Sequence, residues 1–270
     1  MVIQKTPDEI ELMARAGAVL AEVHEVLAEA VAPGVSTAEL DALAVREIAA
    51  RGAEPSFLGH HGYPATLCTS LNDQIVHALP SASVRLRRGD LVSLDCGVIV
   101  DGYHSDAACT WVVGGREQAD ERTLTLVDAA YDALWAGIAA LRPGNRLGDV
   151  SYAIGAEADR HGLGVIAEHD GHVVGGHGIG RQMHEDPLVP GRGRPGRGMR
   201  LRPGLVFAIE PMFTLGSAGF RVADDGWTIS TLDGSRAAHW EHTVAITDQG
   251  PRVLSARPTE SRLLALAAGA

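Results

Sequence analysis

The sequence predicts an α+β fold built from two similar halves, residues 7–113 and 117–247, within a single domain spanning residues 1–270. Each half begins with two segments of helical periodicity, continues into segments rich in β-branched residues, and contains an apolar strand ending in a carboxylate. The turn at Pro33-Gly34 is repeated at Pro143-Gly144, an offset of 110 residues (143 minus 33). Such a repeat predicts a pseudo-twofold axis, with antiparallel sheets joined across it and the helices on the outer side.

The helix ends are marked by local signals. Thr6-Pro7-Asp8-Glu9 is a capping box with proline at the first helical position, and Ser36-Thr37-Ala38-Glu39 is a second capping box. Glycines after Arg51 and His161 are typical of helix C-termini. These signals predict helices over about residues 7–31, 36–51 and 117–141, followed by a fourth helix that ends at His161.

Two segments of the first half predict hairpins. Residues 63–78 and 91–113 are rich in Val, Ile, Thr and Tyr. Turn residues interrupt them at Asn72-Asp73 and Asp101-Gly102. We therefore expect each segment to fold back on itself.

Composition excludes several classes of protein. With 23 Lys plus Arg against 34 Asp plus Glu, the net charge is −11, which argues against specific binding of nucleic acid. Three cysteines without a CxxC pair predict neither a disulfide framework nor a zinc ribbon. The N-terminus lacks the pattern of a signal peptide, and Leu91–Val100 is too short to span a bilayer. We expect a cytoplasmic monomer without a membrane partner.

Four acidic residues lie on or beside apolar strands: Asp95, Asp106, Glu210 and Glu241. Antiparallel pairing about the Asp101-Gly102 turn can bring the first two together. One such acid is often a turn cap or a hydrogen-bonded core residue. Four acids in the related strands of one repeat are hard to satisfy without cations.

Histidines add possible ligands and proton donors. His177 lies inside the glycine-rich segment 175–180, and His184 follows seven residues later. Glycines in such a segment allow close approach of backbone to a ligand or a strand. His77 alternates with apolar positions on a predicted strand; taken alone, it is expected to be a core histidine.

Together these residues resemble type I methionine aminopeptidases of the pita-bread metallopeptidase fold, and the resemblance covers nearly the whole chain. The matching segments are Gly62-Tyr63-Pro64 with Cys68, Asn72 to His77, Leu94-Asp95 with Asp101 to Asp106, Gly176 to Arg181 with His184-Glu185, Ile209-Glu210-Pro211, Asp225 to Thr228 and Glu241-His242-Thr243.

The resemblance implies a set of roles. Two divalent ions (cobalt, manganese, iron or zinc) would be bound by Asp95, Asp106, His177, Glu210 and Glu241. Glu210 would also hold the attacking water as general base, and His184 would donate to the developing oxyanion. His77 would contact the substrate near the scissile bond, while one ion would bind the free α-amine.

The resemblance also implies a side-chain pocket for methionine. Sulfur and aromatic groups suit a thioether. The residues expected to bind substrate are Phe57, Tyr63, Cys68, His77, Met183, His184 and Trp227. His60, Val174 and Ala78 depart from residues common in the family, which puts fine substrate preference in doubt.

The implied function is removal of the initiator methionine from nascent chains with a small second residue, so the expected partners are nascent polypeptide N-termini. Alternatives are a proline-directed aminopeptidase or prolidase of the same fold, and a non-catalytic module that binds peptide or nucleic acid. The arginines of residues 190–202 predict a solvated loop, with the ribosome as the alternative partner for them.

Overall fold

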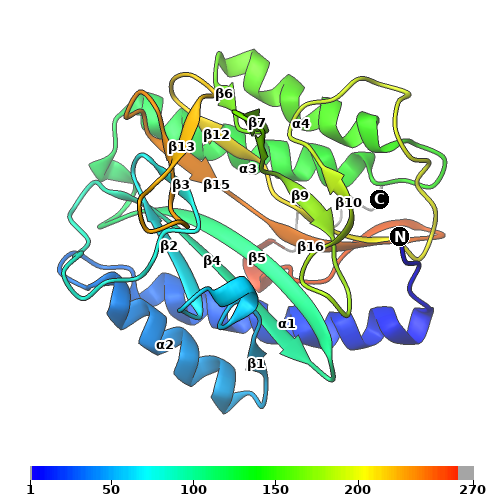
Figure 1. The fold of residues 1–270 in the computed structure, drawn as a ribbon, viewed down its shortest axis with the longest axis horizontal. Helices are drawn as coiled ribbons and strands as arrows, with labels where there is room; N and C mark the ends of the chain where they lie inside the picture. The colour runs from blue at the N-terminus through cyan, green and yellow to red at the C-terminus, as the bar shows by residue number, and fades with distance from the viewer. Residues whose placement is uncertain (1, 261–270) are drawn as a thin grey trace.

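The computed structural model describes residues 2–260, so the predicted domain's first residue and residues 261–270 lie outside the described part. In each half of the chain a pair of helices is followed by a run of strands, so helices and strands are segregated as in an α+β fold (Figure 1). Four α-helices are formed by Pro7–Ala30 (α1), Thr37–Ala50 (α2), Glu121–Ala140 (α3) and Leu147–His161 (α4). Short 3₁₀ turns lie at His60–Gly62, Arg116–Gln118 and Pro258–Glu260.

The predicted helices are confirmed, with small shifts at their ends. Both capping boxes form, because the hydroxyls of Thr6 and Ser36 accept from the backbone N–H three residues on. The third helix starts at Glu121 rather than residue 117, since Asp120 caps it by accepting from the Thr123 amide at 2.7 Å. Gly162 ends α4 in the left-handed region, with φ of 63°.

The first half of the chain contributes a sheet around one long strand. Its strands are Glu54–Pro55 (β1), Leu67–Leu71 (β2), Leu91–Val100 (β4) and Tyr103–Val112 (β5), with Gln74–Val76 (β3) outside it. The β4–β5 hairpin is formed as predicted, in continuous antiparallel register from Leu91↔Val112 to Val100↔Tyr103.

The segment 63–78 folds back on itself as predicted, since the Thr69 amide donates to the Ala78 carbonyl at 2.9 Å, but its two strands do not form the predicted hairpin ladder. β2 pairs with β4, whereas β3 pairs with a strand of the second half, Ile229–Thr231 (β14). The Gln74 side chain accepts from the Leu71 amide at 2.9 Å, which closes the turn with a side chain in place of a strand ladder. His77, predicted to lie on a strand, lies just after the end of β3. Its φ of 61° takes the backbone out of the extended conformation.

The second half contributes a five-stranded sheet and smaller sheets beside it. The order in the larger sheet is β10-β9-β11-β16-β17. These strands are Gly176–Gly178 (β9), Glu185–Val189 (β10), Val206–Ile209 (β11), His242–Thr247 (β16) and Gly250–Val253 (β17). The remaining strands are Gly164–Val165 (β6), Glu168–His169 (β7), His172–Val173 (β8), Met212–Thr214 (β12), Phe220–Val222 (β13) and Ala237–His239 (β15).

The two large sheets are joined where β5 meets β16. The Glu241 amide donates to the Ala108 carbonyl at 2.9 Å. The Thr243 hydroxyl accepts from the Asp106 amide at 2.8 Å and donates to the Asp106 carbonyl at 2.9 Å. The buried Thr243 thus links the second half to both backbone groups of Asp106 in the first, beside the bond from Glu241.

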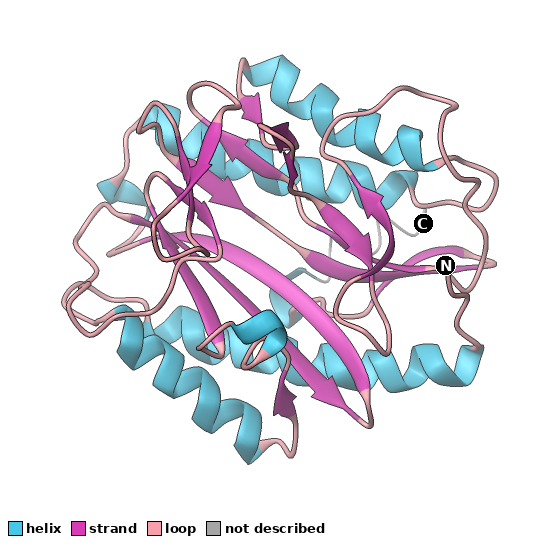
Figure 2. Cartoon of the chain, viewed as in Figure 1, coloured by secondary structure: helices cyan, strands magenta, loops and turns pink. Residues whose placement is uncertain are grey.

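Helices flank the strands on opposite edges. In Figure 1, α1 and α2 run along the lower edge and α3 and α4 along the upper edge; the strands fill the middle (Figure 2). One apolar core packs α1 and α2 against β4, around Leu20, Leu40 and Leu94. Another packs α3 and α4 against β11, around Leu134 and Phe207. Burial of each of these side chains stabilises the folded state by roughly 1.5–3 kcal/mol.

The arginine- and glycine-rich loop is exposed but attached to α4. Arg192 pairs with Asp159 at 2.8 Å, and the Gly196 amide donates to Asp149 at 2.7 Å. Among residues 2–260, no helix is long and apolar enough to cross a membrane.

Replacement of Gly176 by alanine is expected to weaken the second sheet and displace its neighbour His177. A Cβ at this position would lie 2.4 Å from the Ala208 carbonyl oxygen, so β9 would have to move away from β11. Gly171→Ala is the matched control, because Gly171 has positive φ but open space around it. We expect the control to lose roughly 1–2 kcal/mol in denaturant unfolding and Gly176→Ala to lose more. Equal losses would contradict the steric argument.

Candidate metal centre

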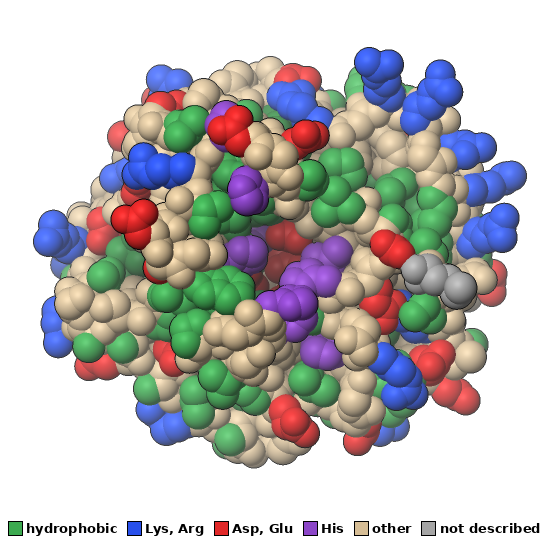
Figure 3. All heavy atoms as spheres, in the orientation of Figure 1, with side chains coloured by type: hydrophobic (Ala, Val, Ile, Leu, Met, Phe, Trp, Pro, Cys, Tyr) green, Lys and Arg blue, Asp and Glu red, His purple; other side chains and the backbone are tan. Residues whose placement is uncertain are grey.

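One small cavity, of about 100 Å³, gathers the residues predicted from the sequence. Figure 3 views it face-on: acidic atoms lie at the bottom of a hollow in the middle of this face, with histidine side chains gathered around them. The cavity is lined by Asp95, Asp106, His177, Glu210, Glu241, His77, His184, Phe57, Tyr63, Cys68, Met183 and Trp227, together with His60 and His61.

Asp95 and Asp106 meet because of the register of the β4–β5 hairpin. Asp95 lies opposite Ala108, and Asp106 lies opposite Gly97. The two acids are therefore diagonal neighbours on one face of the sheet, where side chains can reach each other. Both are buried, with 6% and 4% of their surface exposed.

His177 and Glu210 are brought together by the second sheet. His177 lies opposite Ala208 on β11, and Glu210 directly follows that strand. The glycines flanking His177 are needed for close packing: a Cβ on Gly176 would lie 2.4 Å from one carbonyl oxygen of β11, and one on Gly178 would lie 2.4 Å from the Asp186 carbonyl. The His177 imidazole reaches 3.8 Å from Glu210 and 3.9 Å from Asp106, both measured from Nε2.

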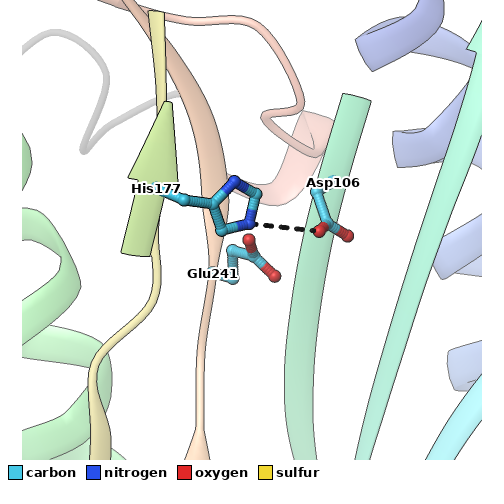
Figure 4. A group of neighbouring side chains, drawn as sticks. All are labelled: Asp106, His177 and Glu241. Carbon is cyan, nitrogen blue, oxygen red and sulfur yellow. Dashed lines mark ion pairs between the residues drawn. The ribbon is translucent and has the colours of Figure 1, made fainter. Parts of the chain in front are cut away.

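Glu241 completes the group from the two-residue link between β15 and β16. One potential ligand atom each from Asp106, His177 and Glu241 lies within 4.8 Å of the others (Figure 4). His177 Nδ1 is 2.9 Å from the Gly178 carbonyl. A proton on Nδ1 satisfies that contact and leaves the Nε2 lone pair directed at the acids, as metal-binding histidines require.

The residues of this cluster fit divalent metal ions. Asp95 Oδ1, Asp106 Oδ1 and Glu241 Oε1 are buried without a hydrogen-bond partner within residues 2–260. An unpaired buried carboxylate oxygen is costly unless a cation or proton compensates it. Oxygen-rich ligation with imidazole suits manganese, iron, cobalt or zinc and does not choose among them.

The pKa values of the acids follow from their crowding. Burial raises the pKa of Asp95 to about 7, and burial together with the charge of Asp95 raises the pKa of Asp106. Burial, and after it the negative charge of Asp106, also raises the pKa of Glu241. Burial acts in the same direction on Glu210, but the imidazoles of His239 and His177 outweigh it and lower its pKa. Protons and cations therefore compete for three of the four carboxylates.

Neutral histidines stand beside the acids. Burial lowers the pKa of His184 to about 3 and that of His77 to about 4, so both are uncharged at neutral pH. His184 Nδ1 lies 3.0 Å from His60 Nε2. If His60 donates in this bond, the remaining proton of His184 is on Nε2.

The apolar wall of the cavity is made by rings and sulfur atoms. Tyr63 packs edge-on against Trp227 at 5.1 Å and against Phe57 at 6.4 Å, between ring centroids. Its hydroxyl donates to backbone carbonyls, which satisfies its polar end. Cys68 pairs with Asp95 across β2 and β4, so the wall adjoins the acids directly.

Comparison with known proteins agrees with this geometry: residues 11–248 match metallopeptidase family M24. The chain belongs to that family. Methionine aminopeptidase 1 of Mycobacterium tuberculosis is 52% identical over 261 residues, covering 94% of this chain and 95% of the relative. Methionine aminopeptidase 1 of Bacillus subtilis is 41% identical, covering 94% and 99%.

Solved M24 structures show the same fold. Methionine aminopeptidase from Thermotoga maritima superimposes with a TM-score of 0.90 at 39% identity, covering 94% of this chain and 99% of that one. Prolidase from Pyrococcus furiosus has a TM-score of 0.72 at 24% identity, and only 65% of its chain is covered. The α+β pita-bread fold is thereby confirmed.

Three histidines near the cluster were not predicted as site residues. His60 and His61 line the cavity, and His239 Nε2 lies 3.5 Å from Glu210 Oε2. For His60 and His61 the sequence offers no periodic signal, since they lie in a 3₁₀ turn. His239 is the last residue of β15 and precedes Glu241 by two residues, and this closeness to a candidate ligand in the sequence was a signal that could have identified it.

Asp95→Asn is expected to stabilise the metal-free protein increasingly as pH rises. The folded state holds the Asp95 proton up to a pKa of about 7, whereas 3.8 is the ordinary value that applies to the unfolded chain. Raising pH between these values therefore costs the wild type stability, because its folded state binds more protons. At ~1.4 kcal/mol per pKa unit, the advantage of Asn should grow by about 2–3 kcal/mol between pH 5 and pH 8.

The measurement is denaturant unfolding of chelator-treated wild type and variant at both pH values. With manganese or cobalt added, the order should reverse, because the variant lacks one of the negative charges that a cation in this cluster would balance. A difference independent of pH would contradict the assigned ionisation of Asp95.

Proposed function

We propose that this protein is a methionine aminopeptidase that removes the initiator methionine from nascent chains whose second residue is small. The observation that carries the proposal is one cavity in which a cluster of buried acids and histidines adjoins a wall of aromatic and sulfur groups. Relatives that are 40–52% identical over most of the chain and named methionine aminopeptidase support it.

The metal ligands we propose are Asp95, Asp106, His177, Glu210 and Glu241. Four carboxylates carry four negative charges, which two divalent ions would balance. When bound, such ions polarise a carbonyl and make water acidic enough to attack near neutral pH. Unpartnered oxygens on three of the acids support their role as ligands.

Glu210 is the proposed general base. It is the one acid of the four with a lowered pKa, so it is the one best able to stay ionised and accept a proton from the attacking water. The side chain is 11% exposed, which leaves it in contact with the cavity. It would then pass the proton to the leaving amine as the peptide bond breaks.

His184, which directly precedes β10, is the proposed donor to the developing oxyanion. His77, which directly follows β3, is the proposed contact to the substrate near the scissile bond. Both are neutral imidazoles at neutral pH, so each can donate one N–H without adding charge to the centre. Phe57, Tyr63 and Trp227, with Cys68 and Met183, would hold the thioether of the substrate.

The first test measures release of free methionine from Met-Ala-Ser and Met-Leu-Ser peptides. We expect manganese- or cobalt-loaded protein to cleave the alanine peptide only. We expect no cleavage after chelation and none by Glu210→Ala. Thermal unfolding of the variant serves as the control for folding. Cleavage of an Xaa-Pro peptide instead would favour the proline-directed alternative. Absence of hydrolysis with any metal would favour the non-catalytic module.

His184→Ala is expected to reduce kcat by about 10²–10³-fold while the metal content stays unchanged, because one oxyanion donor is lost. Steady-state kinetics with elemental analysis checks this. His161→Ala, an exposed histidine at the end of α4, is the matched control and should leave kcat unchanged. Loss of metal from the His184 variant would instead identify His184 as a ligand.

A further inference from the structure

His239 is a buried imidazole for which neither the fold nor the proposed ligand set has a use. It is the last residue of β15, and only 1% of its surface is exposed. Neither ring nitrogen has a hydrogen-bond partner in the described part of the chain. Leaving a buried polar group unpaired is unfavourable, so the ring requires a partner.

The backbone of His239 is held from both sides by one threonine. The Thr110 hydroxyl donates to the His239 carbonyl at 2.7 Å and accepts from the His239 amide at 2.9 Å. Ser93 lies 2.8 Å from the same hydroxyl. Because β5 carries both Thr110 and Asp106, the imidazole is positioned by the strand that supplies one of the acids.

The ring points at the acids. Nε2 lies 3.5 Å from Glu210 Oε2 and 4.0 Å from Glu241 Oε2. The other oxygen of Glu210 faces His177, with Oε1 3.8 Å from its Nε2. Glu210 thus lies between two imidazoles, one at each oxygen.

We propose that His239 is a positioning residue that donates an Nε2 hydrogen bond to Glu210 and thereby orients this carboxylate towards the metal ions. An imidazole nitrogen that faces an ionised carboxylate can stabilise it only by donating a hydrogen bond, and a 3.5 Å contact needs a shift of a few tenths of an ångström to become one. Contacts of this kind are often long before ligand binds. The inference rests on the proposed metal centre.

The test measures cobalt binding to the full-length, chelator-stripped protein. Isothermal titration calorimetry gives the affinity, and visible absorption gives the spectrum of the bound cobalt. Compared with wild type, His239→Ala should bind cobalt about 10–100-fold more weakly, the usual effect of removing a hydrogen-bond partner of a metal ligand. His239→Gln should restore most of the affinity and the wild-type absorption spectrum, because its amide can also donate. His24→Ala is the matched control.

The control separates stability from metal binding. His24 is equally buried, but its Nε2 contacts the Ala107 carbonyl and its ring stacks near Trp111. The variant His24→Ala should lower the thermal midpoint of the metal-free protein without changing its affinity for cobalt. Unaltered affinity in His239→Ala would overturn the inference, as would a Gln variant as weak as the Ala variant, which would indicate direct nitrogen ligation. Failure of the wild type to bind cobalt would overturn the metal centre itself.

Discussion

Mutual repulsion among four carboxylates, confined to one small cavity, is the constraint on which the rest of this structure depends. Each sheet supplies some of the acids: Asp95 and Asp106 come from the first, while Glu210 and Glu241 flank strands of the second. Their burial disfavours ionisation, and three of them have raised pKa values in the absence of cations. The centre therefore opposes folding unless protons or metal ions neutralise it, and the two apolar cores flanking it must offset that cost.

Rigid backbone contacts hold the acids in place. Thr243 binds both backbone groups of Asp106, and Thr110 does the same for His239, so two hydroxyls from neighbouring strands align the halves. Glycine at 176 lets β9 approach β11 closely enough for His177 to reach the acids. A site built on paired strands keeps its donor atoms in place better than one built on loops, which suits a centre whose charges must meet within a few ångströms.

Two kinds of side chain surround the acids: neutral imidazoles and an apolar wall of aromatic rings. The imidazoles of His77 and His184, which stay neutral at physiological pH, lie beside the acids and can donate hydrogen bonds without changing the net charge of the acidic cluster. Tyr63 and Trp227 form an apolar wall immediately beside them. Apolar walls exclude water and so strengthen the electrostatic interactions inside the cavity.

Local signals in the sequence determined the helices and the β4–β5 hairpin, because capping boxes, turn residues and period-two patterns act over a few residues. The strand expected to end at Asp95 instead continues to Val100, so Asp95 and Asp106 lie in the middle of β4 and β5, and only Glu210 directly follows a strand. Resemblance to a family carried the assignment of roles, which local patterns cannot supply. Only the tertiary structure decided that β2 and β3 separate into different sheets, since partner choice depends on strands more than 150 residues away, such as β14. It also decided that His239 faces Glu210 and that His60 meets His184, contacts between segments that no short-range pattern connects.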